Sequence, residues 1–285
     1  MKSTGDDRVE NPVAGAAGTP MIALRKLTKA FGSKVALRGI DLTVAPGESV
    51  AVFGPNGAGK TTLIRILCSL SRPTSGSVQI GGLALSTHAD GIRRHLGVVS
   101  HAPLLYDSLT AEENLRFFAR LYNLPDAGPR INAMLERVGL TGRRGDLVRT
   151  FSRGMVQRLA IARALIHDPE VLLLDEPDTG LDPQAAEMLH RLLAELSGRQ
   201  PRGATALPDN SNTAQPPLVG ADLRGRSRPT ARTIVMVTHN LERGLAIADR
   251  AIILANGRIA LDASTRDLGL TELRALYDRH AGGSR

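Results

Sequence analysis

Short strand-like runs, amphipathic from Met21 and apolar at 49–53, recur along the first third of the chain. The runs are bounded by Gly, Pro or Ser, the residue types that form tight turns. The first predicted strand begins at Met21. Further strands are predicted at 36–44, 49–53, 78–80 and 97–100, with turns at 32–33 and 46–47. The run 49–53 leads directly into a glycine-rich loop at 54–59.

Other parts of the chain follow the helical period or are wholly apolar. Leu63, Ile66, Leu67 and Leu70 recur at i, i+3, i+4 and i+7 and predict a helix after the glycine-rich loop. Residues 111–166 are predicted to be mostly helical, with two apolar faces, one formed by Leu115, Phe118, Ala119 and Tyr122 and one by Met155, Leu159, Ala162 and Ile166. The runs 171–174, 234–237 and 251–254 are continuously apolar, as strands buried on both faces of a parallel sheet are. The pattern predicts an α/β fold.

Two segments lack these periods. Residues 1–20 contain no apolar stretch typical of a secretory signal and predict a flexible tail. Residues 199–232 contain five prolines, six arginines and no aromatic residue, between a helix ending near Ser197 and the strand at 234. An α/β unit needs only a few residues there, so we interpret 199–232 as a disordered basic insertion on the surface. A tolerated loop expansion is favoured over an arm that docks on a membrane or a partner.

Composition narrows the class of protein. The 285 residues fit one large domain or two small ones, and 42% hydrophobic with 22% charged residues is ordinary for a soluble protein. No apolar run approaches the length of a membrane helix. The single cysteine, Cys68, excludes an internal disulfide and fits a reducing, intracellular environment. A net charge of +8 suits an anionic partner, but five Phe and three Tyr offer few stacking platforms for single-stranded nucleic acid.

The glycine-rich loop matches the phosphate-binding pattern G-x-x-x-x-G-K-[ST] between a predicted strand and a predicted helix. Its residues are Gly54, Pro55, Asn56, Gly57, Ala58, Gly59, Lys60 and Thr61, followed by Thr62. Glycines let successive backbone N–H groups point at phosphate oxygens, and the helix adds its positive N-terminus. Lys60 is then placed for the β- and γ-phosphates and the Thr61 hydroxyl for Mg²⁺. An ordinary glycine-rich turn would not need these flanks, so we predict a nucleotide site.

Two carboxylates, Asp175 and Glu176, end the apolar run 171–174. Ligands bind at the carboxyl ends of strands in open α/β sheets. Asp175 suits the coordination sphere of Mg²⁺, and Glu176 is placed to polarise the water that attacks the γ-phosphate. The alternative, two carboxylates that merely cap a strand, is weakened by their pairing with the phosphate loop.

A third motif is the run Phe151-Ser152-Arg153-Gly154-Met155-Val156-Gln157-Arg158, in which Ser152 and Gly154 would form an anion-binding helix cap. With 178–182 and 237–239, it resembles the signature, D-loop and H-loop of ABC ATPases in order and spacing. The resemblance covers nearly all of 21–285 except the insertion. It implies a P-loop NTPase (RecA-like) core, an antiparallel β subdomain and an α-helical subdomain at about 102–165, with ATP and Mg²⁺ as ligands.

The same resemblance implies further roles and partners. Phe31 would stack on adenine, unless it is simply a hydrophobic residue at a strand end, and His239 would contact the γ-phosphate. Lys60, Glu176 and His239 would be the catalytic residues. Ser152 and Gly154 would close over ATP held by a second ATPase subunit, most simply an identical copy. Integral membrane permease subunits would complete a transporter at the cytoplasmic face of the cell membrane, with no nucleic acid bound.

Some positions depart from the family pattern. Arg153 and Met155 replace a glycine and the glutamine of the common signature, and His101 stands where a glutamine ligand of Mg²⁺ is usual. His101 could still serve in the Mg²⁺ shell. Together with the run 109–117, these departures are similar to the haem-exporter ATPase of cytochrome c maturation. Drug and polysaccharide exporter ATPases share such signatures and stay open alternatives.

Coupling to a membrane partner is expected through the region after His101. Tyr106, Phe117 and Phe118 could form a hydrophobic dock there, although Phe118 and Tyr122 fit the core of the helical subdomain equally well. A DNA-repair or translation ABC protein would carry a long coiled coil or duplicated motifs, and neither is present. A regulatory module that binds ATP without hydrolysing it is disfavoured by the intact Asp175-Glu176 pair.

Overall fold

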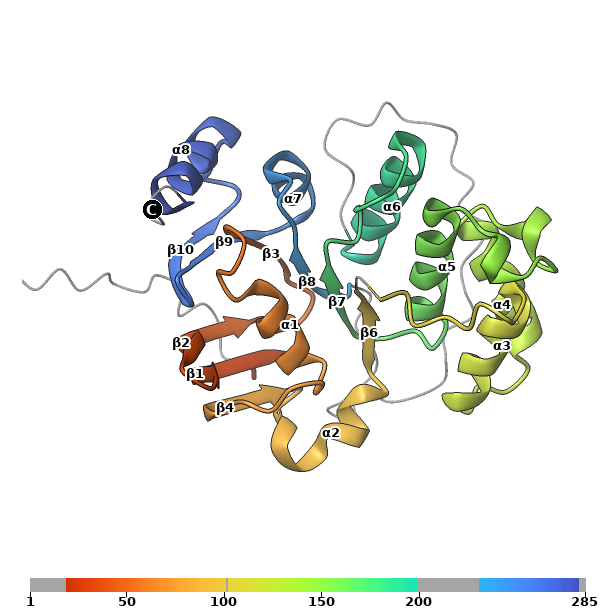
Figure 1. Cartoon of the computed structure of the whole chain (residues 1–285), viewed down its shortest axis with the longest axis horizontal. Helices are drawn as coiled ribbons and strands as arrows, with labels where there is room; N and C mark the ends of the chain where they lie inside the picture. Colours follow the sequence, from red (N-terminus) through yellow and green to blue (C-terminus); the bar gives the residue numbers. More distant parts are fainter. Residues whose placement is uncertain (1–18, 101, 199–230, 282–285) are drawn as a thin grey trace, which may run out of the picture.

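The computed structural model describes residues 19–100, 102–198 and 231–281. Figure 1 shows an antiparallel sheet on one side, a larger sheet in the middle and a group of helices on the other side. The strands are β1 (Ile22–Phe31), β2 (Lys34–Val44), β3 (Ser49–Phe53), β4 (Ser75–Ile80), β5 (Leu83–Ala84), β6 (Leu96–Val99), β7 (Val171–Asp175), β8 (Thr233–Val237), β9 (Arg250–Ala255) and β10 (Arg258–Ser264). The α-helices are α1 (Lys60–Leu67), α2 (Leu85–Arg93), α3 (Ala111–Leu121), α4 (Ala127–Arg137), α5 (Arg153–Leu165), α6 (Pro183–Leu196), α7 (Leu241–Ile247) and α8 (Leu270–Ala281).

The smaller sheet has the order β2-β1-β4-β5 and is antiparallel throughout. Its strands β1 and β2 are joined by a tight turn in which Gly32 has a positive φ of 57°. Ile22, Leu24 and Leu27 are almost fully buried, and a register shift between Leu24 and Leu27 lets both residues face the core although they are three positions apart. This sheet is the antiparallel β subdomain that the sequence predicts.

The larger sheet has the order β10-β9-β3-β8-β7-β6, and all its pairs are parallel except β9 with β10. Every residue of β3, β7 and β8 is buried, as are residues 251–255 of β9. The buried strands predicted from the continuously apolar runs 171–174, 234–237 and 251–254 are thus confirmed. Val237 of β8 pairs with Val52 of β3 and with Asp175 of β7. The carboxyl ends of these three strands therefore meet at one edge of the sheet.

The helices α3, α4 and α5 pack against one another at the far side of the molecule from the antiparallel sheet (Figure 1). Leu115 and Ala119 are fully buried there, and Phe118 and Tyr122 are partly buried against the same hydrophobic cluster. The predicted helical region is confirmed, with two short 3-10 turns, Thr141–Arg143 and Val148–Thr150, between α4 and α5. None of the described helices is both long and apolar enough to span a membrane.

The predicted first helix ends earlier than its apolar period suggests. Leu70 lies outside α1, and 64% of its surface is exposed. The helix stops because Ser69 has a left-handed backbone with φ 58°, which turns the chain away after Cys68. The expectation that Leu70 lies on the buried face is therefore wrong.

Several expectations fall on residues that the structure does not describe. These residues are 1–18, 101, 199–230 and 282–285, so most of the predicted tail, His101 and most of the predicted insertion lie outside the described chain. Arg232, at the end of that insertion, is described. Its backbone N–H donates to the carbonyl of Leu196 at 2.7 Å, and its guanidinium pairs with Asp168.

Candidate functional site

The glycine-rich loop 54–59 links the carboxyl end of β3 to the first residue of α1. Gly54 and Gly59 have positive φ angles of 149° and 107°. A Cβ atom on Gly54 would lie 2.1 Å from the carbonyl oxygen of Leu254, and one on Gly59 would lie 2.6 Å from that of Ala36. Only glycine fits at both positions, so the neighbouring strands fix the path of the loop. The N-terminus of α1 faces the loop and favours an anion.

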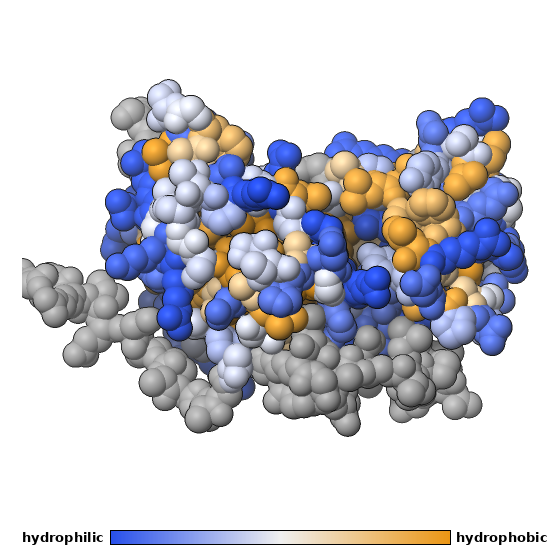
Figure 2. Space-filling model, turned by 90° about the horizontal axis from the view of Figure 1, so that it is seen from below, coloured by the Kyte–Doolittle hydropathy of each residue, from blue (hydrophilic) through white to orange (hydrophobic). Residues whose placement is uncertain are grey.

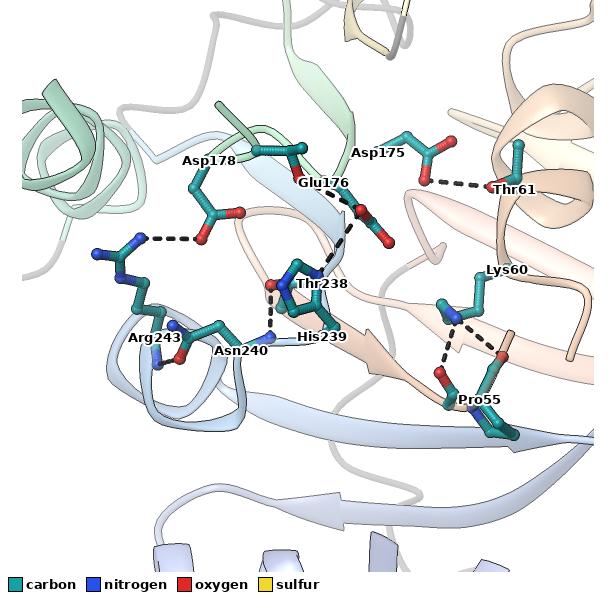
Figure 3. Close-up of polar contacts among 12 residues, drawn as sticks. Pro55, Lys60, Thr61, Asp175, Glu176, Asp178, Thr238, His239, Asn240 and Arg243 are labelled. Carbon is teal, nitrogen blue, oxygen red and sulfur yellow. Dashed lines mark hydrogen bonds and ion pairs between the residues drawn. The ribbon is translucent and has the colours of Figure 1, made fainter. Parts of the chain in front are cut away.

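Lys60, the first residue of α1, lies with its ammonium group at this loop. Its Nζ donates to the carbonyl oxygens of Gly54 at 2.7 Å and Pro55 at 3.0 Å (Figure 3). Burial lowers the pKa of Lys60, while the nearby carboxylates of Glu176 and Asp175 act in the opposite direction. The side chain is thus held where a phosphate bound in the loop would meet it.

The two predicted carboxylates separate into different environments at the end of β7. Asp175 is 3% exposed, and one of its carboxylate oxygens lies 3.5 Å from the Thr61 hydroxyl, which donates to it (Figure 3). Glu176 has a left-handed backbone with φ 50°, and its N–H donates to the carbonyl of Val237 at 2.9 Å. The left-handed turn directs the Glu176 side chain away from the strand, toward the loop that follows β8.

His239 lies in that loop and faces Glu176. Its Nδ1 is 3.7 Å from Glu176 Oε2, while the hydroxyl of Thr179 donates to the same oxygen at 3.3 Å (Figure 3). The imidazole is 64% exposed. The structure therefore brings together five of the predicted site residues, namely Lys60, Thr61, Asp175, Glu176 and His239.

The signature residues Ser152 and Gly154 lie apart from this group, at the start of α5. Ser152 is the N-cap, and its hydroxyl accepts the N–H of Met155 at 3.3 Å. A Cβ on Gly154 would meet nothing closer than 3.8 Å, so the space beside it is open within the described chain. Arg153, where the common pattern has glycine, lies against Gly180. The start of α5 thus presents an exposed, anion-friendly helix end.

A cavity of about 230 Å³ separates the start of α5 from Glu176. It is lined by Ser100, Pro103, Phe151, Arg153, Val156, Gln157, Glu176 and Thr179. Phe31, the other predicted nucleotide contact, ends β1 with 54% of its surface exposed, and Lys29 Nζ lies 4.8 Å from its ring centre. An exposed aromatic face is available there for stacking.

Sequence reasoning missed the contacts that hold the loop after Glu176. Gln157 of α5 donates from Nε2 to the carbonyl of Pro177 at 2.8 Å. Arg243 of α7 pairs with Asp178, with Nη1 3.1 Å from Oδ2 (Figure 3). Asp178 and Arg243 are 65 residues apart in the chain, so no local spacing signals the pair.

The chain is similar in sequence to one protein family and to several curated proteins. A sequence model described as "ABC transporter" matches residues 37–179. The uncharacterized ABC transporter ATP-binding protein YdbJ of Bacillus subtilis is 34% identical over 91% of this chain and 74% of its own length. The Nod factor export ATP-binding protein I of Ralstonia nicotianae is 32% identical over 87% of this chain and 68% of its own length. The daunorubicin resistance ATP-binding protein DrrA3 of Streptomyces coeruleorubidus is 35% identical over 84% of this chain and 67% of its own length.

Among solved structures, the ATP-binding cassette MJ0796, a dimer in a post-hydrolysis state bound to ADP and Pi, has a similar fold. The TM-score is 0.70 at 27% sequence identity, over 87% of this chain and 100% of that one. The arrangement of core, antiparallel sheet and helical region is therefore shared with a protein solved with the products of ATP hydrolysis.

Proposed function

Since the chain belongs to the ABC transporter family of ATP-binding proteins, we propose that its ATPase activity drives export across a membrane. The observation that supports ATP hydrolysis is that Lys60, Asp175 and Glu176 lie together at the edge of the sheet where β3 and β7 end. A loop built for phosphate, a cation and two carboxylates in different environments fit phosphoryl transfer to water.

Substrate binding would use groups that are already in place. The N–H groups of loop 54–59 and the N-terminus of α1 would hold the phosphates of ATP, with the Lys60 ammonium at the β- and γ-phosphates. Thr61 and Asp175 supply a hydroxyl and a carboxylate oxygen, the donor types that Mg²⁺ prefers, and would hold that ion beside the phosphates. When bound, Mg²⁺ neutralises charge on the β- and γ-phosphates. We also propose that His101 contributes to the coordination shell of this Mg²⁺ ion.

Hydrolysis would then depend on Glu176 and His239. The Glu176 carboxylate would orient the attacking water and draw its proton as the oxygen approaches the γ-phosphorus. Thr179 holds one Glu176 oxygen, which leaves the other available for water. His239, 3.7 Å from that carboxylate, would contact the γ-phosphate and keep it aligned with the water.

A complete site would need two subunits. Ser152 and Gly154 lie on an exposed helix end of this chain, with open space beside Gly154. We propose that this helix end closes over the ATP of a second, identical subunit, and the positive charge of Arg153 would favour that approach. The dimeric state of MJ0796 supports the arrangement.

An exposed apolar area on the helical region would serve as the dock for a membrane permease. Tyr106 and Phe117 are 48% and 40% exposed, and their rings meet edge to face at 4.9 Å. Leu104 and Leu121 are also exposed, and Figure 2 shows hydrophobic surface on this side of the molecule. Phe118 packs inward instead, so we leave it out of the dock. Such a contact would hold the chain at the cytoplasmic face of the membrane, with no nucleic acid partner.

The cargo is proposed at the level of a class. The names of two relatives concern Nod factor export and daunorubicin resistance, which supports an exporter of small organic molecules, the drug or polysaccharide type. Haem export for cytochrome c biogenesis is a narrower hypothesis that rests on Arg153, Met155, His101 and the run 109–117.

Replacement of the carboxylate tests the proposal. In Glu176→Gln, we expect turnover of ATP to fall by about 10²-fold or more, because the water loses its proton acceptor, while ATP binding persists. The matched control is Glu187→Gln on α6, an exposed residue that pairs with Arg191 on the same helix and should leave turnover unchanged. Wild-type turnover in Glu176→Gln would refute the role of Glu176. Co-purification of the chain with nucleic acid, and not with a multi-span membrane protein, would refute the transport role.

A further inference from the structure

Two loops carry the groups proposed to face the attacking water. Glu176 lies in the loop after β7, and His239 lies in the loop after β8. The imidazole of His239 is 64% exposed, and its 3.7 Å separation from Glu176 is longer than a hydrogen bond. That contact alone cannot fix the position of His239 relative to Glu176.

One ion pair joins the loop after β7 to the first turn of α7, the helix that begins two residues after His239. Arg243 Nη1 lies 3.1 Å from Asp178 Oδ2, and the side chains of Arg243 and Asp178 are 35% and 10% exposed (Figure 3). Asp178 is two residues after Glu176, and Arg243 is four residues after His239. We propose that this ion pair is a positioning device that sets the separation of Glu176 and His239 for hydrolysis.

Short-range bonds connect Arg243 rigidly to His239. The side chain of Asn240 caps α7 by accepting the N–H of Arg243 at 3.0 Å, and the N–H of Asn240 donates to the Thr238 hydroxyl at 3.1 Å. His239 lies inside the turn that the second bond closes, between Thr238 and Asn240. A displacement of the first turn of α7 is therefore passed on to His239.

The helix α7 has a second attachment, on the strand that leads into the phosphate loop. A Cβ on Gly244 would lie 2.3 Å from Phe53 Cζ, so α7 lies directly on β3 at this point. Arg243 is the adjacent residue and reaches Asp178. Loss of the ion pair would remove the side-chain bond that joins the first turn of α7 to the loop after β7, while the contact at Gly244 remains.

A histidine of α6 also interacts with this ion pair. The pKa of His190 is lowered, first by burial and then by the charge of Arg243, while the charges of Asp178 and Glu187 act in the opposite direction. A lowered pKa favours the neutral imidazole, which does not compete with Arg243 for the Asp178 carboxylate. Partial burial also shields the pair from solvent, which strengthens it relative to exposed pairs.

The inference rests on the proposed roles of Glu176 and His239, and steady-state ATP hydrolysis by the full chain tests it. In Arg243→Gln and in Asp178→Asn, we expect kcat to fall on the order of tenfold to a hundredfold, because a small misplacement near the reacting atoms is costly. The KM for ATP should stay within about twofold, since the phosphate loop is untouched. The double variant should be no slower than the slower single variant, because both remove one interaction. Arg243→Lys, which keeps a cation, should recover part of the loss.

The matched control is Arg191→Gln on α6. Arg191 forms an ion pair with Glu187 at the same 3.1 Å, but both side chains are more than half exposed and lie in no loop of the site. We expect wild-type kcat in this variant. Thermal unfolding of every variant identifies any that fails to fold, and Asp178→Asn and Arg243→Lys then carry the test.

Three results would overturn the inference. These are wild-type kcat in Arg243→Gln, a rise in KM that accounts for the whole loss, and losses that multiply in the double variant. A wild-type chain that does not hydrolyse ATP would refute the proposed function itself. An active wild type with an unaffected Arg243→Gln refutes only the positioning role.

Discussion

Cys68, the residue that ends α1, is buried behind the phosphate loop helix. Burial raises the pKa of its thiol to about 12, with the charge of Asp175 acting in the same direction and that of Arg163 against it. The thiolate is the reactive form of cysteine. A thiol this far from its ordinary pKa of 9.0 stays protonated, and therefore inert, throughout the physiological range.

We therefore predict that iodoacetamide labels Cys68 slowly in the folded chain at pH 8. A pKa near 12 instead of 9 leaves about 10³-fold less thiolate, and the labelling rate should fall accordingly. Mass spectrometry after timed labelling gives the rate, with the chain in denaturant as the control. Equal rates in the folded and denatured chain would contradict the burial of Cys68.

Single residues also show what a sequence can and cannot reveal. Lys60 and Glu176 were predictable because each lies inside a short contiguous motif whose flanks indicate a strand end. The pairs Gln157 with Pro177 and Asp178 with Arg243 join segments that meet only after folding. Hydrophobic periodicity does not predict such contacts, because it indicates which side chains are buried and not which polar groups pair.

The helix α3 begins with a capping box. The Thr110 hydroxyl accepts the N–H of Glu113 at 3.2 Å, and the Glu113 carboxylate accepts the N–H of Thr110 at 2.8 Å. Two donors that the helix leaves without intrahelical partners are thereby satisfied. This helix also carries Phe117 and Leu121, so its stability supports the proposed dock.

We predict that Thr110→Ala lowers the free energy of unfolding by about 1 kcal/mol, the usual contribution of an N-cap. Urea unfolding followed by circular dichroism measures the change. Thr110→Ser keeps the hydroxyl and should lose much less. Equal losses in the two variants would mean that the methyl group of Thr110, and not its capping bond, stabilises the helix.

Element types followed from the sequence more reliably than element ends. The strands β7 and β8 were predictable because burial on both faces makes them continuously apolar. The end of α1 was not, because Leu70 continues the helical period while the backbone of Ser69 breaks it. A left-handed serine carries no signal in an apolar pattern.

At the scale of the whole molecule, the active unit is proposed to be a pair of chains, each completing the other's site. Lys60 would act on the ATP of its own subunit, and Gly154 on that of its partner. Because the nearest atom outside its own helix, the carbonyl oxygen of Gly180, would lie 3.8 Å from a Cβ built on Gly154, the chain should tolerate a side chain there even though the assembled site would not.

This arrangement predicts complementation between two inactive chains. Lys60→Met and Gly154→Val should each be inactive alone. Mixed, they should recover about a quarter of the wild-type rate, because about half of the dimers are mixed and each has one intact site of two. Titrating one purified variant into the other while following phosphate release measures the recovery. An activity that stays at zero would show that both residues serve the same subunit's site, or that both sites must be intact.

The left-handed backbone of Glu176 has a consequence for how this protein can change. A residue with a Cβ in that conformation costs about 1–2 kcal/mol, and glycine would avoid the cost. Glycine would also remove the carboxylate on which turnover is proposed to depend. Selection for a more robust fold and selection for a faster enzyme therefore pull this position in opposite directions, and glutamate persists only while turnover matters more. A descendant that no longer needed to hydrolyse ATP would gain stability by giving up this side chain.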